Sequence, residues 1–296
     1  MGMFYRRKIL LSLLQVFDNQ LEKVQLQKLL LLFSNLQKKA DYDFVPYKYG
    51  CFSFQANADL GTMAKYGLVS ATEQHWKKET PENFLVALRK LDAEAIRVIK
   101  HLYDLKTSEE LIAITYRKFP YYAIKSKIAE KILNEKEYAV VNTRIPVSGE
   151  KCLFTIGYEG VSLEEYLNKL IKLDVKVLCD VRKNSFSMKY GFSKSQLKTA
   201  CEGVDIQFYH FPEVGIDSAD RQNLQSQADR DALFRQYKTE VIPRTGAVQQ
   251  TILDLLHQYH RVAITCFEAQ SCDCHRSHLA AAITQLPKFY YAVKHI

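Results

Sequence analysis

Short apolar runs alternate with helical segments throughout the second half of the chain, from Cys152 onward. Apolar runs of about four to eight residues that alternate with helices are typical of parallel strands, because helices must cover both faces of a parallel sheet. The expected strands are residues 152–157, 176–181, 205–211 and 261–266, the expected helices are 162–172, 193–202, 230–242, 246–259 and 275–285, and residues 289–296 are expected to be extended. The sequence therefore predicts an α/β fold with a mostly parallel sheet flanked by helices.

The first part of the chain has helical periodicity instead. Apolar side chains between Leu21 and Leu36 fall on one broad face, as in a core helix. Ser53 is suited to cap a helix that ends near Tyr66, and Gly67 then favours a stop before an extended segment. Further helices are expected at residues 92–104, 108–118 and 121–135, and residues 71–84 are expected to form a polar hairpin or loop. Helices followed by a short β-wing predict a winged-helix-like domain.

The chain is long enough, at 296 residues, for two separate cores. The segment from Glu137 to Glu150 is polar and contains proline, serine and glycine, which is typical of a linker. We therefore predict a mainly helical domain at residues 1–136, a linker at 137–150 and an α/β domain at 151–296.

Composition narrows the expected location and partners. No apolar run is long enough to cross a membrane, and the basic residues near the N-terminus are not followed by a small-residue cleavage signal. We therefore expect a cytoplasmic protein without a membrane partner. The seven cysteines are irregularly spaced, which favours reduced thiols over a disulfide framework. The net charge of +8 is compatible with a polyanionic partner such as DNA.

Polar residues that can carry chemistry follow four of the predicted strands. Because the carboxyl ends of parallel strands meet at one edge of a sheet, we expect their side chains to line one crevice. The catalytic candidates are Asp180, Arg182, His210, Glu213, Cys266, Glu268 and Arg276. The substrate-binding candidates are Tyr158, Glu159, Ser187, Cys274 and His275.

The arginines among these candidates predict the binding of an anion. Arg182 and Arg276 can hold a phosphate or carboxylate with a two-pronged fork. Asp180 can orient Arg182 or act as an acid or base, and the alternative is that the two form only a structural ion pair. His210 and Glu213 are a candidate acid–base pair, unless His210 only hydrogen-bonds a neighbouring carbonyl group.

The cysteines of the last loop allow other chemistry. Cys266 ends an apolar strand and can act as a nucleophile if nearby cationic groups lower its pKa, although a cysteine there can also simply fill the core. Cys274 is predicted to be the better exposed thiol. Zinc prefers donors of the kind that Cys266, Cys272, Cys274 and His275 offer. Their spacing is not a standard zinc pattern, and the adjacent donors Cys274 and His275 would strain a tetrahedral site. The sequence therefore predicts no metal ligand and no cofactor.

Several motifs of the second half occur in the order found in a known family. They are Thr155-Ile-Gly-Tyr-Glu-Gly160, Asp180-Val-Arg182, Tyr209-His-Phe-Pro-Glu-Val-Gly215, and Cys266-Phe-Glu268 with Cys274-His-Arg276. On these motifs, residues 152–296 resemble the domain-of-unknown-function 488 family. The resemblance implies a fold and functional cysteine, arginine and acidic positions, but no reaction. Ser185 and Ile216 stand where the family tends to have proline and glycine, which leaves the shapes of those two loops open.

Two shorter resemblances imply other roles. Asp180-Val-Arg182 and Cys274-His-Arg276-Ser277 are similar to motifs of rhodanese-like domains, which implies thiol or sulfur-transfer chemistry. In the first half, Lys28-Leu-Leu30, Tyr42–Gly50, Phe52-Ser53 and Gly67-Leu-Val69 resemble the SocA-like (Panacea) antitoxin family, with Cys51 where a proline is more usual. That resemblance implies a link to toxin–antitoxin or phage defence systems.

These features together predict an enzyme that acts on an anionic nucleotide or nucleic-acid substrate. Its N-terminal domain is expected to recruit it to DNA or to a protein partner. Two alternatives remain open. A non-catalytic regulator could bind DNA or protein with the first domain and sense an anionic ligand with the second, or Cys266 or Cys274 could perform thiol or sulfur transfer.

Overall fold

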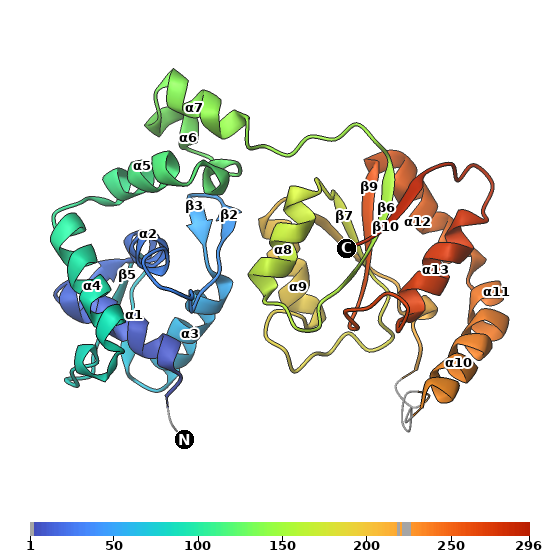
Figure 1. The fold of residues 1–296 in the computed structure, drawn as a ribbon, viewed down its shortest axis with the longest axis horizontal. Coiled ribbons are helices and arrows are strands. Elements are labelled where there is room, and N and C mark those ends of the chain that lie inside the picture. The colour runs from blue at the N-terminus through green and yellow to red at the C-terminus, as the bar shows by residue number, and fades with distance from the viewer. Residues whose placement is uncertain (1–2, 218–219, 221–225) are drawn as a thin grey trace. The chain divides into compact units, whose positions relative to one another are not determined.

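The computed structural model describes residues 3–217, 220 and 226–296. The chain divides into two compact units, Met1–Ile145 and Pro146–Ile296, each with its own core (Figure 1). Within the described ranges, no helix combines the length and the apolar character that crossing a membrane would require.

The N-terminal unit combines helices with two small antiparallel sheets. Its elements are α1 (Tyr5–Val16), β1 (Gln20–Glu22), α2 (Lys23–Ser34), β2 (Val45–Tyr47), β3 (Gly50–Phe52), α3 (Phe54–Lys65), β4 (Val69–Ala71), β5 (His75–Lys78), η1 (Leu85–Ala87), α4 (Lys90–Tyr103), α5 (Ser108–Lys118), η2 (Pro120–Ala123), α6 (Ala129–Ile132) and α7 (Glu135–Asn142). Strand β5 pairs with both β1 and β4, and β2 and β3 form a hairpin.

Helix α2 is the centre of this unit. It packs against α1, α4 and α5, so the side chains from Leu26 to Ser34 are buried around its whole circumference. Ser53 caps α3 by accepting a hydrogen bond from the amide of Ala56 (3.2 Å), as predicted. Gly67 adopts a φ of +69°, which lets the chain leave α3 and enter β4.

The prediction of one helix over residues 121–135 is wrong, because η2, α6 and α7 occupy this region. Pro120 begins only a short 3-10 turn. Asn134 starts a new helix because its side chain accepts a hydrogen bond from the amide of Glu137 (3.0 Å), and the Glu137 side chain accepts one from the Asn134 amide (3.2 Å). Residues 137–142, which the sequence analysis placed in the linker, therefore belong to α7.

The C-terminal unit alternates strands and helices. Its elements are β6 (Cys152–Gly157), α8 (Leu163–Lys172), β7 (Val177–Asp180), α9 (Lys194–Gly203), β8 (Gln207–His210), η3 (Pro212–Val214), α10 (Gln227–Gln236), the π-helical η5 (Tyr237–Val241), α11 (Ile242–Arg244), α12 (Gly246–Tyr259), β9 (Arg261–Cys266), α13 (His275–Thr284) and β10 (Ala292–His295). Every strand pair is parallel, in the order β10-β6-β9-β7-β8. The predicted α/β fold with a parallel sheet flanked by helices is confirmed.

The direction of the crossovers reverses inside this sheet. The chain moves from β6 through β7 to β8 in one direction and returns to β9 and β10 in the other. Right-handed crossovers therefore place α8 and α9 on one face and α12 and α13 on the other (Figure 1). Helix α13, which follows β9, therefore lies on the opposite face of the sheet from α8 and α9, which follow the neighbouring strands β6 and β7. Such a reversal opens a crevice at the carboxyl ends of the strands, where α/β proteins bind ligands.

The single helix predicted at residues 230–242 is divided in the structure into three helical segments. It begins at Gln227, and the π-helical η5 leads from α10 into the short helix α11. Pro243 explains the change, because it has no amide hydrogen and its ring would clash with the carbonyl group four residues earlier in a regular α-helix. The wider π-helical turn accommodates the proline.

Candidate functional site

Glycines bring the loops at the carboxyl edge of the sheet into direct contact. A Cβ on Gly157, at the end of β6, would lie 1.8 Å from the carbonyl oxygen of Glu268 in the loop after β9. A Cβ on Gly215, after β8, would lie 2.2 Å from the amide nitrogen of Lys183 in the loop after β7. Only glycine allows such close backbone approach. The four predicted groups of residues therefore lie along one edge of the sheet.

Asp180 and Arg182 form a buried two-pronged ion pair. The guanidinium donates from Nε to Oδ1 (2.8 Å) and from Nη2 to Oδ2 (2.6 Å), and its Nη1 donates to the hydroxyl of Tyr158 (2.6 Å). Burial lowers the pKa of Arg182, but the hydrogen bonds and charge of Asp180 outweigh burial and raise that pKa above its ordinary value. The two guanidinium nitrogens of Arg182 that were predicted to bind a phosphate thus bind Asp180 instead. The third nitrogen holds the hydroxyl of Tyr158 in place.

An aromatic platform surrounds Tyr158. Its ring stacks on Phe192 at 4.2 Å and meets the edge of Phe267 at 5.3 Å. Lys189 donates to the carbonyl oxygen of Tyr158 (2.7 Å), and Ser187 accepts a hydrogen bond from Ser193 through its carbonyl oxygen (3.0 Å). The contacts of Lys189 and Phe192 with Tyr158 tie the loop after β7 to the loop after β6.

Two adjoining hollows form what we call the strand-end crevice. The first, of about 280 Å³, is lined by Tyr158, Arg182, Ser187 and Phe267 together with Lys183 and Phe186. The second, of about 190 Å³, shares Lys183 and Ile216 with the first and reaches Glu213 and Asp217. The first hollow is cationic and aromatic, and the second has an acidic wall. Phe186 and Met188 stand at the rim of the first hollow, 70% and 91% exposed.

Two histidines hold the backbone of the loop after β7. His210 contacts the carbonyl oxygen of Arg182 through Nε2 (2.9 Å), and His275 contacts that of Val181 through Nε2 (3.1 Å). A carbonyl oxygen only accepts hydrogen bonds, so both rings carry a hydrogen on Nε2. His210 therefore makes the neighbouring-carbonyl contact that the sequence analysis left as an alternative. Glu213 lies in the η3 turn and is exposed.

The cysteines of the last loop are arranged differently from the prediction. Cys274 is only 1% exposed, so its prediction as the better exposed thiol is wrong, and Cys272 is the exposed one. Cys274 is buried because it is the N-cap of α13, whose first turn packs into the unit. Burial and the neighbouring Cys266 raise the pKa of Cys274 well above its ordinary value. Cys266 is 0% exposed, and its thiol lies 3.2 Å from Glu268 Oε2.

The side chain of Arg276 is buried and binds backbone carbonyl groups. It is 1% exposed and donates from Nη1 to the carbonyl oxygen of Glu268 (2.5 Å) and from Nη2 to that of Ala269 (2.9 Å). Glu159 adds to the same loop by accepting a hydrogen bond from the amide of Ala269 (3.0 Å). Arg276 and Glu159 thus fix the loop after β9 and do not line the first hollow.

Residues 162–283 match the model of a protein family described as Domain of unknown function DUF488. The matched segment lies within the C-terminal unit, which we call the DUF488 domain after this match. No curated protein and no solved structure matches the chain. The matched segment includes every candidate from Asp180 to Arg276, while Tyr158 and Glu159 precede it. The family description names no activity, so any function must be argued from the site.

Some side chains that give the crevice of the DUF488 domain its character are not among the site residues predicted from the sequence. They are Lys183, Phe186 and Phe267, which line the first hollow. One signal was available, because Phe186 stands in a polar loop between two serines, where an aromatic side chain has no core to join. The inward turn of Phe267 depends on contacts with Tyr158 that no local pattern reveals.

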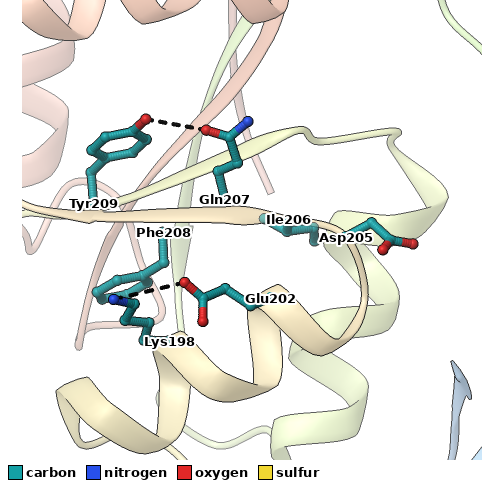
Figure 2. A pocket seen from close by; sticks show the side chains of 7 residues that line it. All are labelled: Lys198, Glu202, Asp205, Ile206, Gln207, Phe208 and Tyr209. Atoms are coloured by element: carbon teal, nitrogen blue, oxygen red, sulfur yellow. Dashed lines mark hydrogen bonds and ion pairs between the residues drawn. The ribbon is translucent and has the colours of Figure 1, made fainter. Parts of the chain in front are cut away.

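Another hollow of the DUF488 domain lies away from these loops. It measures about 380 Å³ and runs along α9 and the edge strand β8, where it is lined by Lys198, Glu202 and residues 205–209 (Figure 2). Its polar side chains satisfy one another, since Lys198 pairs with Glu202 at 3.8 Å and the Tyr209 hydroxyl donates to Gln207 at 3.1 Å. None of the predicted site residues lines it, so the strand-end crevice is the better candidate site.

Proposed function

We propose that the DUF488 domain binds an anionic nucleotide or nucleic-acid substrate in the strand-end crevice and acts on it as an enzyme. One observation carries this proposal: Lys183 and exposed aromatic rings line the same hollow at the carboxyl ends of the strands. Aromatic rings stack on nucleobases, and lysine attracts phosphate. A single ligand with both groups, a nucleotide, satisfies both features.

The rim of the hollow fits a stacked base. Phe186 and Met188 expose most of their side chains to water, and a bound planar ring would cover them. Below the rim, the buried pair of Asp180 and Arg182 holds the Tyr158 hydroxyl in a fixed position. A preorganised polar group of this kind orients a substrate without further loss of side-chain entropy. Glu213, in the acidic second hollow, is the proposed base.

The alternative of thiol or sulfur transfer has less support. A nucleophilic thiol must reach its substrate, and Cys266 and Cys274 are 0% and 1% exposed. Burial also raises the pKa of Cys274, which lowers its thiolate fraction at neutral pH. The exposed aromatic and cationic hollow therefore favours the anion-binding function.

The N-terminal unit is proposed to recruit the enzyme to a partner. Helices α1, α2 and α3 precede the antiparallel hairpin of β4 and β5, an order that supports a winged-helix arrangement. The β2–β3 hairpin carries an aromatic cluster, in which Phe52 stacks on Tyr47 at 4.8 Å and meets Phe54 at 5.0 Å. On α3 the exposed residues are Asn57 and Lys65, which is few cations for a DNA-reading helix. The aromatic hairpin favours a protein partner, and a role in phage defence remains a prediction from the SocA-like motifs.

The proposed substrate site can be tested by binding to the full-length protein. Fluorescence polarisation would measure the affinity for labelled nucleotides and short single-stranded DNA and RNA at two salt concentrations. We expect Lys183→Glu and Phe186→Ala each to weaken binding about ten-fold, since one phosphate contact or one stacked base is worth about 1–3 kcal/mol. The matched controls are Lys198→Glu and Tyr290→Ala, which change an exposed lysine and an exposed tyrosine of the same unit.

Two outcomes of this experiment decide between the candidate functions. Equal losses in Lys183→Glu and Lys198→Glu would mean that overall charge, and not the crevice, attracts the ligand. If a ligand binds in the crevice, mass spectrometry after incubation shows whether it has been converted. A tightly bound ligand recovered unchanged under all conditions would favour the non-catalytic regulator over the enzyme.

A further inference from the structure

Three side chains with metal-binding atoms meet where β9 ends and α13 begins, and the carboxylate of Glu268 lies beside one of them. The sulfur atoms of Cys266 and Cys274 and Nδ1 of His275 lie within 4.8 Å of one another. Oε2 of Glu268 lies 3.2 Å from the Cys266 sulfur but is farther than 4.8 Å from at least one of the other two donors. We propose that these four side chains bind one Zn²⁺ ion. Thiolate and imidazole are the donors that zinc prefers, and a carboxylate can complete its tetrahedral set.

The distances between the donors approach those around a zinc ion. Bonds of about 2.3 Å from zinc to sulfur and about 2.0 Å from zinc to nitrogen give a tetrahedron with edges of about 3.5–3.8 Å. Nδ1 of His275 lies 3.7 Å from the Cys266 sulfur and 4.0 Å from the Cys274 sulfur. Small side-chain rotations would therefore close these three donors around one ion, with the thiol protons released to solvent. The carboxylate of Glu268 would turn from its place beside the Cys266 sulfur to complete the set.

The backbone explains how two consecutive residues can both face the ion. Cys274 is the N-cap of α13 and is extended (φ −138°, ψ 137°), whereas His275 is the first helical residue. The change from extended to helical backbone brings the two neighbouring side chains together. The strain that the sequence analysis expected from adjacent donors is therefore avoided, and Cys272, which is exposed, takes no part in the cluster.

The surroundings of His275 resemble the outer shell of a metal site. Its Nε2 donates to the carbonyl oxygen of Val181 (3.1 Å), which leaves Nδ1, the atom that faces the two sulfurs, to act as a ligand. Histidines that bind metals usually donate their other ring hydrogen to a carbonyl or carboxylate in this way. The ring of Tyr237 packs edge-on against the imidazole at 5.4 Å and restricts its rotation.

The local charges also suit a divalent cation. Two thiolates and one carboxylate around Zn²⁺ leave one net negative charge. The adjacent Arg276 is 1% exposed and donates to the neutral carbonyl groups of Glu268 and Ala269, which do not neutralise its charge. The negative metal cluster would compensate this buried guanidinium.

Four protein ligands make this a structural site, because a catalytic zinc keeps one position for water or substrate. The ion would fasten the loop after β9 to the start of α13. Phe267 stands between two of the ligands and lines the strand-end crevice, so the ion would hold one wall of the crevice in place. The proposal does not depend on the proposed function, because metal content is measured with no substrate present.

Metal analysis of the full-length protein tests the site. We expect about one zinc per chain after purification without added metal. We expect Cys266→Ser and Cys274→Ser to lose the zinc, while Cys272→Ser, which changes the exposed cysteine of the same loop, should retain it. Circular dichroism would show whether each variant is folded.

A second measurement needs no variant. Wild-type protein stripped with a chelator is titrated with Co²⁺, and the visible spectrum is recorded. We expect one equivalent to bind with the strong absorption of tetrahedral cobalt and its sulfur-to-metal charge-transfer band. The proposal would be overturned if the purified wild-type protein contains no zinc and also binds no Co²⁺. It would likewise be overturned if the Cys274→Ser variant is folded and still contains zinc. A disulfide between Cys266 and Cys274, found by mass spectrometry after purification without a reducing agent, would also overturn it.

Discussion

A single hydrogen atom at Gly157 determines whether the first and last loops of the site can meet. Its missing side chain leaves room for the carbonyl group of Glu268, which a Cβ would overlap at 1.8 Å. We expect Gly157→Ala to lower the free energy of unfolding by about 1–3 kcal/mol, as overpacking of a well-packed region does. Chemical denaturation would measure the loss. Gly246→Ala is the matched control, because a Cβ at that position would meet nothing within 4 Å, and equal stability of the two variants would contradict the described packing.

Lys28 makes the stability of the N-terminal unit depend on pH. Its amino group is buried, 1% exposed, and donates to the carbonyl oxygen of Cys51 (3.0 Å). Burial lowers the pKa of Lys28 below its ordinary value of 10.5. Between the lowered pKa and 10.5 the unfolded chain binds the proton and the folded chain does not. The free energy of unfolding therefore rises with pH in that window, by up to about 1.4 kcal/mol per pH unit from this group.

The Lys28→Met variant isolates this contribution. Cys51 has the opposite effect on the pH dependence of stability. Burial raises the pKa of Cys51, so the contribution of its thiol to the free energy of unfolding falls as pH rises above the ordinary pKa of 9.0. The difference between wild type and Lys28→Met removes most of the cysteine effect. Urea denaturation at several pH values up to 10 should show the wild type gaining stability over the variant. A constant difference at all pH values would mean that the folded protein keeps Lys28 charged.

At the scale of elements, one carboxylate joins α1 to α3. Asp59 on α3 is buried and accepts hydrogen bonds from Arg6 Nε (2.6 Å) and Arg7 Nε (2.7 Å) on α1. We expect Asp59→Ala to lower the free energy of unfolding by about 3–5 kcal/mol, because the arginines lose a buried partner. Asp104→Ala removes the exposed partner of Lys100 in the same unit and should cost about 1 kcal/mol or less. Thermal denaturation compares the two variants, and similar losses would show that the α1–α3 contact contributes little.

Elements with strong local signals could be predicted from the sequence, and those that depend on distant contacts could not. α8 follows a capping box at Ser162 and Glu165 and has one apolar face, so its predicted span of 162–172 nearly coincides with the observed one. The break between η2 and α7 was missed because it depends on Asn134 starting a new helix inside a segment that reads as continuously helical. The π-helical turn before Pro243 was missed for a similar reason, since proline indicates a break but not its geometry.

At the scale of the whole molecule, the sequence predicted where the candidate residues gather but not how they pair. Strand alternation was enough to place Tyr158, Asp180 and Cys266 at one edge of a parallel sheet. The insertion of β9 between β6 and β7 is a long-range choice that no local pattern encodes. The partners of Arg276 are backbone carbonyl groups, which every residue has, so sequence could not identify them. The burial of Cys274 likewise follows from which side of α13 packs inward.

The position of β6 has a consequence for how the DUF488 domain acquires its structure during synthesis. β6 is the first strand of the domain to leave the ribosome, yet both of its neighbours, β9 and β10, are the last two strands to follow it. Its six residues are all buried in the finished sheet. Until β9 has been translated, β6 therefore has no partner strand on either side. In a nascent or prematurely terminated chain it is an unpaired apolar strand that can pair with other chains and aggregate.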